Sequence, residues 1–94
     1  MEQKFITAWE QCRQKAAALE VRIRPLAPEE VLKNAHRTLT GSRLSDGFNQ
    51  LSAKGRLDLS LEALAVDKRF TQLFSDEEVN EALMRLLEAG YRFR

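Results

Sequence analysis

Cysteine is almost absent from this chain, since Cys12 is the only thiol among its 94 residues. One thiol cannot form an intramolecular disulfide, so the sequence excludes the small secreted scaffolds that depend on such bridges. A reducing compartment fits this composition. We therefore expect a cytoplasmic protein.

Long apolar runs are also lacking. The sequence has no stretch of about 18 consecutive apolar residues, the length that a helix needs to cross a bilayer. Its first residues, MEQKFITAWEQ, lack the apolar region of a signal peptide. We therefore expect no membrane-spanning segment and no membrane partner.

An excess of charge of one sign is missing as well. The 15 Lys and Arg residues nearly balance the 14 Asp and Glu residues, which gives a formal net charge of +1 at pH 7. So small a charge supplies no general attraction to nucleic acid or to anionic membranes. A partner has to be inferred from local patterns instead.

The residues that most often perform catalysis or hold metals are scarce. A Cys–His pair acts as a nucleophile only when both groups meet in a pocket, and Cys12 falls on an apolar stripe, which favours a buried structural thiol. His36 is the only histidine, so a closed zinc site cannot be built, and the scattered glycines match no phosphate-binding loop. We expect no enzyme activity, cofactor, metal or small-molecule substrate.

Helical periodicity dominates what is present. Apolar residues recur every three or four positions in several segments, a spacing that places them on one side of an α-helix. The segments expected to be helical are residues 4–19, 28–40, 48–54, 61–66 and 76–89. A chain of this size has room for one modest core. We therefore predict a mainly α single domain over residues 1–94, a small bundle of four or five helices.

The C-terminal segment gives the clearest local prediction. Ser75 and Glu78 have the spacing of a capping box, in which each side chain binds an unpaired backbone N–H of the first helical turn. Gly90 can adopt the left-handed conformation that closes a helix and brings Tyr91 back toward the last turn. We expect a helix over residues 76–89. Its buried stripe should consist of Val79, Ala82, Leu83, Leu86 and Leu87.

Three short segments alternate apolar with polar residues: residues 21–24, 57–59 and 91–93. If they pair, they form a minor two- or three-stranded β element, with its apolar face on the helices and arginines such as Arg22 and Arg24 outside. If they do not pair, they are extended linkers whose apolar side chains fill gaps under the helices. The sequence leaves both interpretations open.

The second half of the chain resembles a winged helix-turn-helix. In that family a short strand leads into a helix capped by serine, and a second, recognition helix ends at a glycine that a strand follows. The corresponding segments here are Leu57–Leu59, Ser60–Val66, Asp76–Ala89 and Tyr91–Phe93. The resemblance implies a nucleic-acid-binding regulator, which is the alternative function.

The charges of the helix in the recognition position argue against that alternative. Arg85 is its only basic residue, and its acidic residues are Asp76, Glu77, Glu78, Glu81 and Glu88. Carboxylates held near phosphates oppose the counterion release that drives binding to nucleic acid. We therefore expect no nucleic-acid partner.

A protein–protein interaction module is the class that remains. So small a chain cannot bury every large apolar side chain that it carries, and some should lie between subunits. We expect a non-catalytic interaction, adaptor or regulatory protein that binds another protein, in the first place a second copy of itself as a homodimer. Phe5 and Trp9 also suit the core. The residues expected at the interface are Phe5, Trp9, Arg22, Arg24, Tyr91 and Phe93.

Overall fold

The fold consists of α-helices and two short 3-10 helices in a computed structural model, which describes residues 1–91. The α-helices are α1 (Glu2–Ala18), α2 (Pro28–Thr40), α3 (Phe48–Ala53), α4 (Leu61–Ala65) and α5 (Asp76–Glu88). The 3-10 helices are η1 (Leu57–Leu59) and η2 (Thr71–Leu73). The prediction of a mainly α fold with four or five helices is confirmed.

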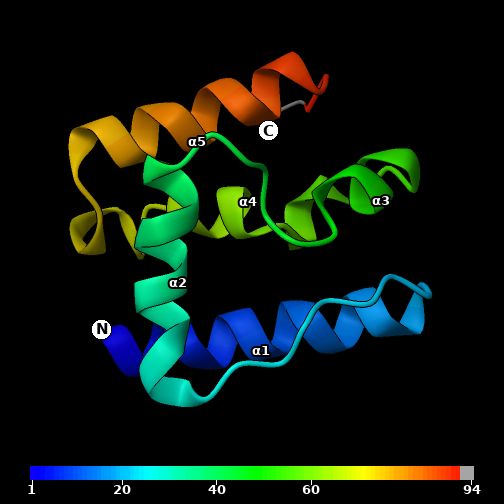
Figure 1. Cartoon of the computed structure of the whole chain (residues 1–94), viewed down its shortest axis with the longest axis horizontal. Coiled ribbons are helices and arrows are strands. Elements are labelled where there is room, and N and C mark those ends of the chain that lie inside the picture. The colour runs from blue at the N-terminus through cyan, green and yellow to red at the C-terminus, as the bar shows by residue number, and fades with distance from the viewer. Residues whose placement is uncertain (92–94) are drawn as a thin grey trace.

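Helices α1 and α5 lie on opposite sides of the molecule, and α2 runs crosswise between them (Figure 1). The short helix α4 lies between these two sides and packs against both α1 and α5. Helix α3 lies at one end and contacts η1. The central position of α4 brings its side chains against residues of α1 and α5.

Local sequence signals set where the helices begin. Helix α2 starts at Pro28, whose fixed φ suits the first helical turn, and Glu29 and Glu30 follow where carboxylates interact favourably with the helix dipole. At the start of α4, the Ser60 hydroxyl oxygen accepts a hydrogen bond of 3.2 Å from the Ala63 N–H. Both starting positions agree with the predicted helices.

The predicted capping box of α5 is confirmed. The Ser75 hydroxyl oxygen accepts a hydrogen bond of 3.1 Å from the Glu78 N–H, and the Ser75 N–H donates one of 2.8 Å to Glu78 Oε1. At the other end Gly90 has a φ of +83°, and the Tyr91 N–H donates to the Leu86 carbonyl at 2.9 Å. A second bond, of 3.0 Å, runs from the Gly90 N–H to the Leu87 carbonyl, and the two bonds make the expected left-handed helix ending, a Schellman motif.

Helix α1 ends with the same motif but without a glycine. The Val21 N–H donates to the Ala16 carbonyl and the Glu20 N–H donates to the Ala17 carbonyl, both at 2.9 Å. Glu20 occupies the left-handed position, with a φ of 66°. This conformation costs a residue with a Cβ atom about 1–2 kcal/mol. The end of α1 therefore stores local strain.

Aromatic rings fill the larger of two buried clusters. Phe5 has no exposed surface, and its ring meets the edges of Phe70 and Phe74 at centroid distances of 5.4 and 5.5 Å. Such edge-to-face contacts add to the gain from burial. The second cluster consists of Ala16, Val21, Phe48, Leu51, Leu57, Leu59 and Leu86.

The β element is not formed within residues 1–91. Leu57 and Leu59 belong to the 3-10 helix η1, where both side chains are buried, and the Ser60 N–H donates to the Leu57 carbonyl at 3.0 Å. A local turn thus satisfies backbone groups that, in a strand, would bond to a neighbouring strand. The strand interpretation of residues 57–59 is wrong.

Residues 21–24 are extended but have no partner strand among the described residues. Instead, the Arg24 N–H donates a hydrogen bond of 2.7 Å to the Asp46 carboxylate, Oδ2. This segment is a linker that a side chain holds in place. The third predicted segment, residues 91–93, extends beyond the residues that the structure describes.

The buried stripe of α5 differs from the predicted one. Ala82 and Leu86 are fully buried as expected, but Leu87 is 54% exposed and Arg85 only 6% exposed. Arg85 was not part of the predicted buried stripe. Arg85 lies inside because other buried groups supply hydrogen-bond partners for its guanidinium.

Candidate functional site

The residues predicted at an interface do not share one surface. Phe5 and Trp9 pack in the core with 0% and 6% of their surface exposed, which is the second of the two roles expected for them. Arg22 and Arg24 are exposed on the segment between α1 and α2, and Tyr91 is half-buried. Phe93 lies outside the described residues.

Cys12 and His36 have different environments and form no dyad among the described contacts. Cys12 is half-buried on α1, where burial raises the pKa of its thiol and so favours the protonated form. The His36 imidazole on α2 binds the Glu78 carboxylate instead, with Nδ1 and Oε2 2.6 Å apart. A protonated thiol and an imidazole held elsewhere do not make an activated nucleophile.

The contact between His36 and Glu78 joins α2 to the start of α5. Burial by itself raises the pKa of the Glu78 carboxyl, but hydrogen bonds from the Ser75 N–H and from His36 outweigh that effect, and its pKa is lowered. The His36 ring also lies 5.1 Å from the ring of Phe74. Glu78 thus lies between Ser75 and His36. A catalytic serine is activated by a histidine that binds it directly, with the carboxylate on the far side of the imidazole, so this arrangement is not a catalytic triad.

Two other kinds of feature do not occur in residues 1–91. No group of three or more histidine, cysteine, aspartate or glutamate side chains is arranged to hold a metal ion in this part of the chain. None of the helices described here combines the length and the apolar character needed to cross a bilayer.

A buried arginine on α5 organises the contacts around it. The guanidinium of Arg85 lies beside Glu62, with Nη1 and Oε2 3.3 Å apart, and its Nε donates to Glu81 Oε2 at 2.7 Å. Nη2 donates to the carbonyls of Thr38 and Gly41 at 3.1 and 2.9 Å. The end of α2 and the following loop are therefore fixed against α5.

Glu62 on α4 has no exposed surface and receives further hydrogen bonds from the same loop. The Ser45 hydroxyl donates to Oε1 at 2.5 Å, and the Ser45 N–H donates to Oε2 at 3.1 Å. All buried side-chain nitrogen and oxygen atoms of the described residues have a partner. The Glu62–Arg85 pair is thus a structural unit in which every buried polar side-chain atom has a hydrogen-bond partner.

The outer surface of α5 exposes two large apolar side chains one turn apart. Met84 is 55% and Leu87 54% exposed. Glu77 and Glu88 are exposed on the same helix beside them. We call this surface, made of Glu77, Met84, Leu87 and Glu88, the acidic α5 face. Met84 lay outside the predicted buried stripe, whereas Leu87 was assigned to that stripe, so the exposure of Leu87 is a finding of the structure.

A second surface lies beside α5, at the end of α2 and in the loop that follows. It is a hollow of about 400 Å³ that contains the 41% exposed side chain of Leu44. Two arginines, Arg37 and Arg43, line it together with three small or polar residues. We call this hollow, formed by residues 37–44, the basic hollow. It has the opposite charge to the acidic α5 face.

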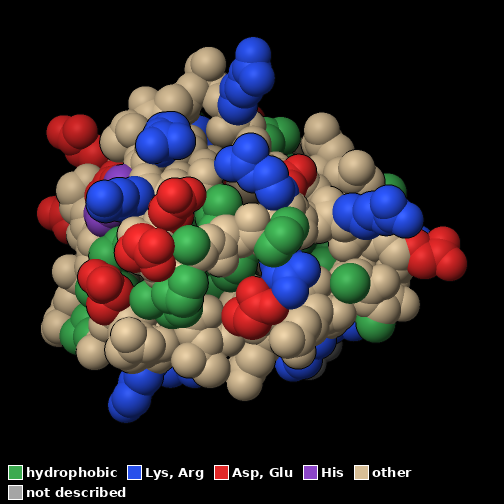
Figure 2. Space-filling view, turned by 60° about the horizontal axis from the view of Figure 1, so that its bottom comes forward, with side chains coloured by type: hydrophobic (Ala, Val, Ile, Leu, Met, Phe, Trp, Pro, Cys, Tyr) green, Lys and Arg blue, Asp and Glu red, His purple; other side chains and the backbone are tan. Residues whose placement is uncertain are grey.

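Figure 2 shows one face of the molecule, on which both basic and acidic side chains lie around a group of apolar side chains. Binding to nucleic acid depends on basic groups that gather on one surface. The mixture of charges on this face does not provide such a gathering.

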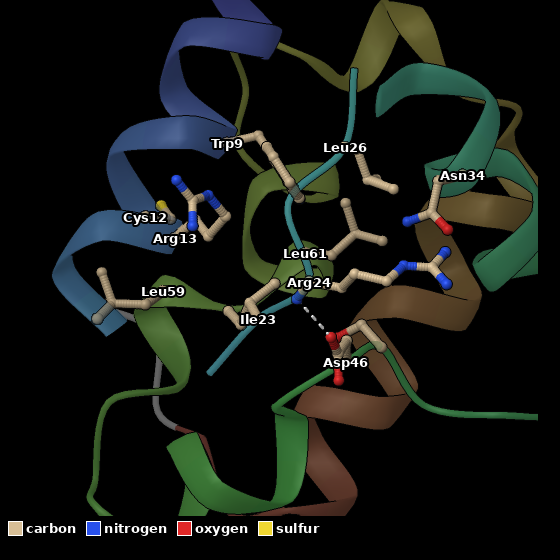
Figure 3. A pocket seen from close by; sticks show the side chains of 11 residues that line it. Trp9, Cys12, Arg13, Ile23, Arg24, Leu26, Asn34, Asp46, Leu59 and Leu61 are labelled. Carbon is tan, nitrogen blue, oxygen red and sulfur yellow. Dashed lines mark hydrogen bonds between the residues drawn. The ribbon is translucent and has the colours of Figure 1, made fainter. Parts of the chain in front are cut away.

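A pocket lies between α1, α2, α4 and the linker that joins α1 to α2 (Figure 3). Its volume is about 310 Å³. Trp9 and Leu61 contribute apolar surface, while Arg24 and Asn34 contribute polar groups. The pattern of the sequence did not indicate this pocket, because its walls come from segments far apart in the chain.

Comparison of the chain with protein-family models, curated proteins and solved structures found no match.

Proposed function

We propose that this chain is a non-catalytic protein–protein interaction module that acts in the cytoplasm as a homodimer. The observation that carries the proposal is the pair of exposed apolar side chains, Met84 and Leu87, on α5. Adjacent large apolar groups on a surface mark interaction sites more often than isolated ones do. The cytoplasmic setting is supported by the single thiol, Cys12, which cannot form a disulfide within the chain.

Charge complementarity supports a second copy as the partner. The acidic α5 face carries Glu77 and Glu88, whereas the basic hollow carries Arg37 and Arg43. Each surface also exposes apolar side chains, so a contact between the two buries apolar area and brings opposite charges together at its edge.

The two surfaces are neighbours in one chain, because Arg85 on α5 donates a hydrogen bond to the Gly41 carbonyl at the rim of the hollow. A two-fold axis between them lets each copy present its acidic α5 face to the basic hollow of the other. Such an arrangement makes two identical contacts and closes at two subunits. Direct pairing of two acidic α5 faces is disfavoured, because carboxylates would meet carboxylates.

Light scattering over a range of protein concentrations tests the dimer. The mass should rise from that of one chain to that of two, and Leu87→Lys should shift this transition to higher concentration. Gln50→Lys is the matched control, since it adds the same charge at an exposed position of α3 and should leave the transition unchanged. A mass of one chain at every concentration would contradict the proposal.

A charge exchange tests the predicted pairing. Arg43→Glu and Glu88→Arg should each weaken the dimer, because each places like charges opposite one another, and the double variant should recover much of the loss. If the dimer of the double variant is no more stable than the less stable dimer of the two single variants, this pairing is refuted. Salt-sensitive retention of the wild type on heparin would instead favour a nucleic-acid partner.

A further inference from the structure

The pocket beneath the linker between α1 and α2 has the size of a binding site for a small molecule. Its volume of about 310 Å³ equals that of about ten water molecules in the liquid and lies at the lower end of the range for ligand pockets. A molecule with one ring and a short substituent fits such a space. The pocket shares no lining residue with the basic hollow.

One part of the pocket is apolar and rigid. Trp9 from α1, Leu59 from η1 and Leu61 from α4 line it, and each has at most 6% of its surface exposed. Because their own helices hold these side chains, the surface exists before any ligand arrives. An apolar ring that enters it leaves water without a large reorganisation of the protein.

The other part of the pocket is polar, and it contains the Asp46 carboxylate besides two side chains that can donate hydrogen bonds. The guanidinium of Arg24 and the amide of Asn34 both line it, and neither side chain has a partner among the described residues. The second arginine of the lining, Arg13, is already paired with Glu10. Arg24 is thus the cation that is available to a ligand.

The position of Arg24 is fixed through its backbone. Its N–H donates a hydrogen bond of 2.7 Å to Asp46 Oδ2, so the linker is held to the loop after α2 while the guanidinium extends along the pocket (Figure 3). The planar donor fork of a guanidinium matches the two oxygens of a carboxylate. A ligand with a carboxylate therefore suits this end of the pocket.

We propose that the pocket binds a small aromatic carboxylate. Its ring lies against Trp9 and Leu61, and its carboxylate receives hydrogen bonds from the Arg24 guanidinium and the Asn34 amide. Binding is non-covalent and needs no second copy of the chain.

Phenylacetate is a suitable probe, and the protein carries its own reporter. Trp9 is the only tryptophan, so its fluorescence and the NMR signal of its indole N–H both report on the pocket. Phenylacetate should change these signals in a saturable way, with a dissociation constant of about 1 mM or lower. The neutral analogue 2-phenylethanol has the same ring and should bind about tenfold more weakly.

Two variants of the linker separate the contribution of the pocket from that of surface charge. Arg24→Gln should weaken phenylacetate binding about tenfold or more, because it removes the charge-assisted bonds. Arg22→Gln removes an exposed arginine that does not line the pocket, and should bind as the wild type does. Circular dichroism checks that both variants are folded.

Three results would overturn the proposal. The first is an indole N–H signal that does not shift with phenylacetate up to about 10 mM. The second is equal affinity for acetate, which would mean that the ring contributes nothing. The third is unchanged affinity in Arg24→Gln.

Discussion

The guanidinium of Arg85 and the carboxylate of Glu62 form an ion pair inside the protein, with 6% and 0% of their side chains exposed and 3.3 Å between Nη1 and Oε2. Two charges removed from water are costly unless further hydrogen bonds satisfy them. Here the loop after α2 supplies those bonds through the Gly41 carbonyl and Ser45. The pair therefore ties two helices and one loop together.

Removal of one member of this pair should strongly destabilise the folded protein. Arg85→Met leaves Glu62 buried without its cation, and we expect a loss of about 3–5 kcal/mol in the free energy of unfolding, measured by urea denaturation. The double variant Arg85→Met, Glu62→Leu should recover part of that loss, because no unpaired charge is left although Ser45 and the loop carbonyls lose their partners. Arg56→Met, which breaks an exposed pair with Asp58, should change little. Equal losses in the single and double variants would contradict this account.

Glu20→Gly should stabilise the protein. Glu20 holds a left-handed conformation at the end of α1, with a φ of 66°, and glycine adopts it without the Cβ strain. We expect a gain of about 1 kcal/mol, or roughly 4–8 °C in melting temperature for a domain of this size. Glu20→Ala keeps the Cβ atom and should give no such gain. A lower melting temperature in Glu20→Gly would show that the strain is absent.

Gly47→Ala should cost more stability than Gly55→Ala. Both glycines have positive φ, 79° and 69°. A Cβ atom on Gly55 meets nothing within 4 Å, so this variant should lose only about 1–2 kcal/mol from backbone strain. On Gly47 it lies 3.0 Å from Ile23 Cγ1 and 3.1 Å from Val21 Cγ1, and overpacking adds about 1–3 kcal/mol. Urea denaturation of the two variants measures the difference, and equal losses would refute it.

Acid should weaken the contact between α2 and α5 through Glu78. The pKa of this carboxyl is lower in the folded chain, so the unfolded chain binds more protons between the two pKa values. The stabilisation by Glu78 is present above the unfolded pKa, about 4.3 for a glutamate, and is lost as the pH falls through the folded value. Glu78→Gln should therefore flatten the pH dependence of the unfolding free energy below about pH 5. An unchanged slope would show that Glu78 does not contribute to it.

Much of the helical fold was predictable because its signals are local. Pro28 and Ser60 mark helix starts, and the capping box of Ser75 and Glu78 depends only on residues within one turn. The candidate surfaces were predictable only in part. Met84 fell outside the predicted buried stripe of α5, but Leu87 was assigned to that stripe and is exposed, and the pocket combines segments that are distant in the chain.

The sequence by itself therefore determined the helices, since capping and periodicity act over a few residues. The tertiary structure decided the state of residues 57–59, which form a 3-10 helix whose Leu57 and Leu59 side chains are buried, and no strand lies beside them within residues 1–91. It also decided that Arg85 is buried, because the partners that satisfy its charge, Glu62 and the loop carbonyls, are distant in the chain. Such long-range satisfaction of a buried charge leaves no periodic signal in the sequence.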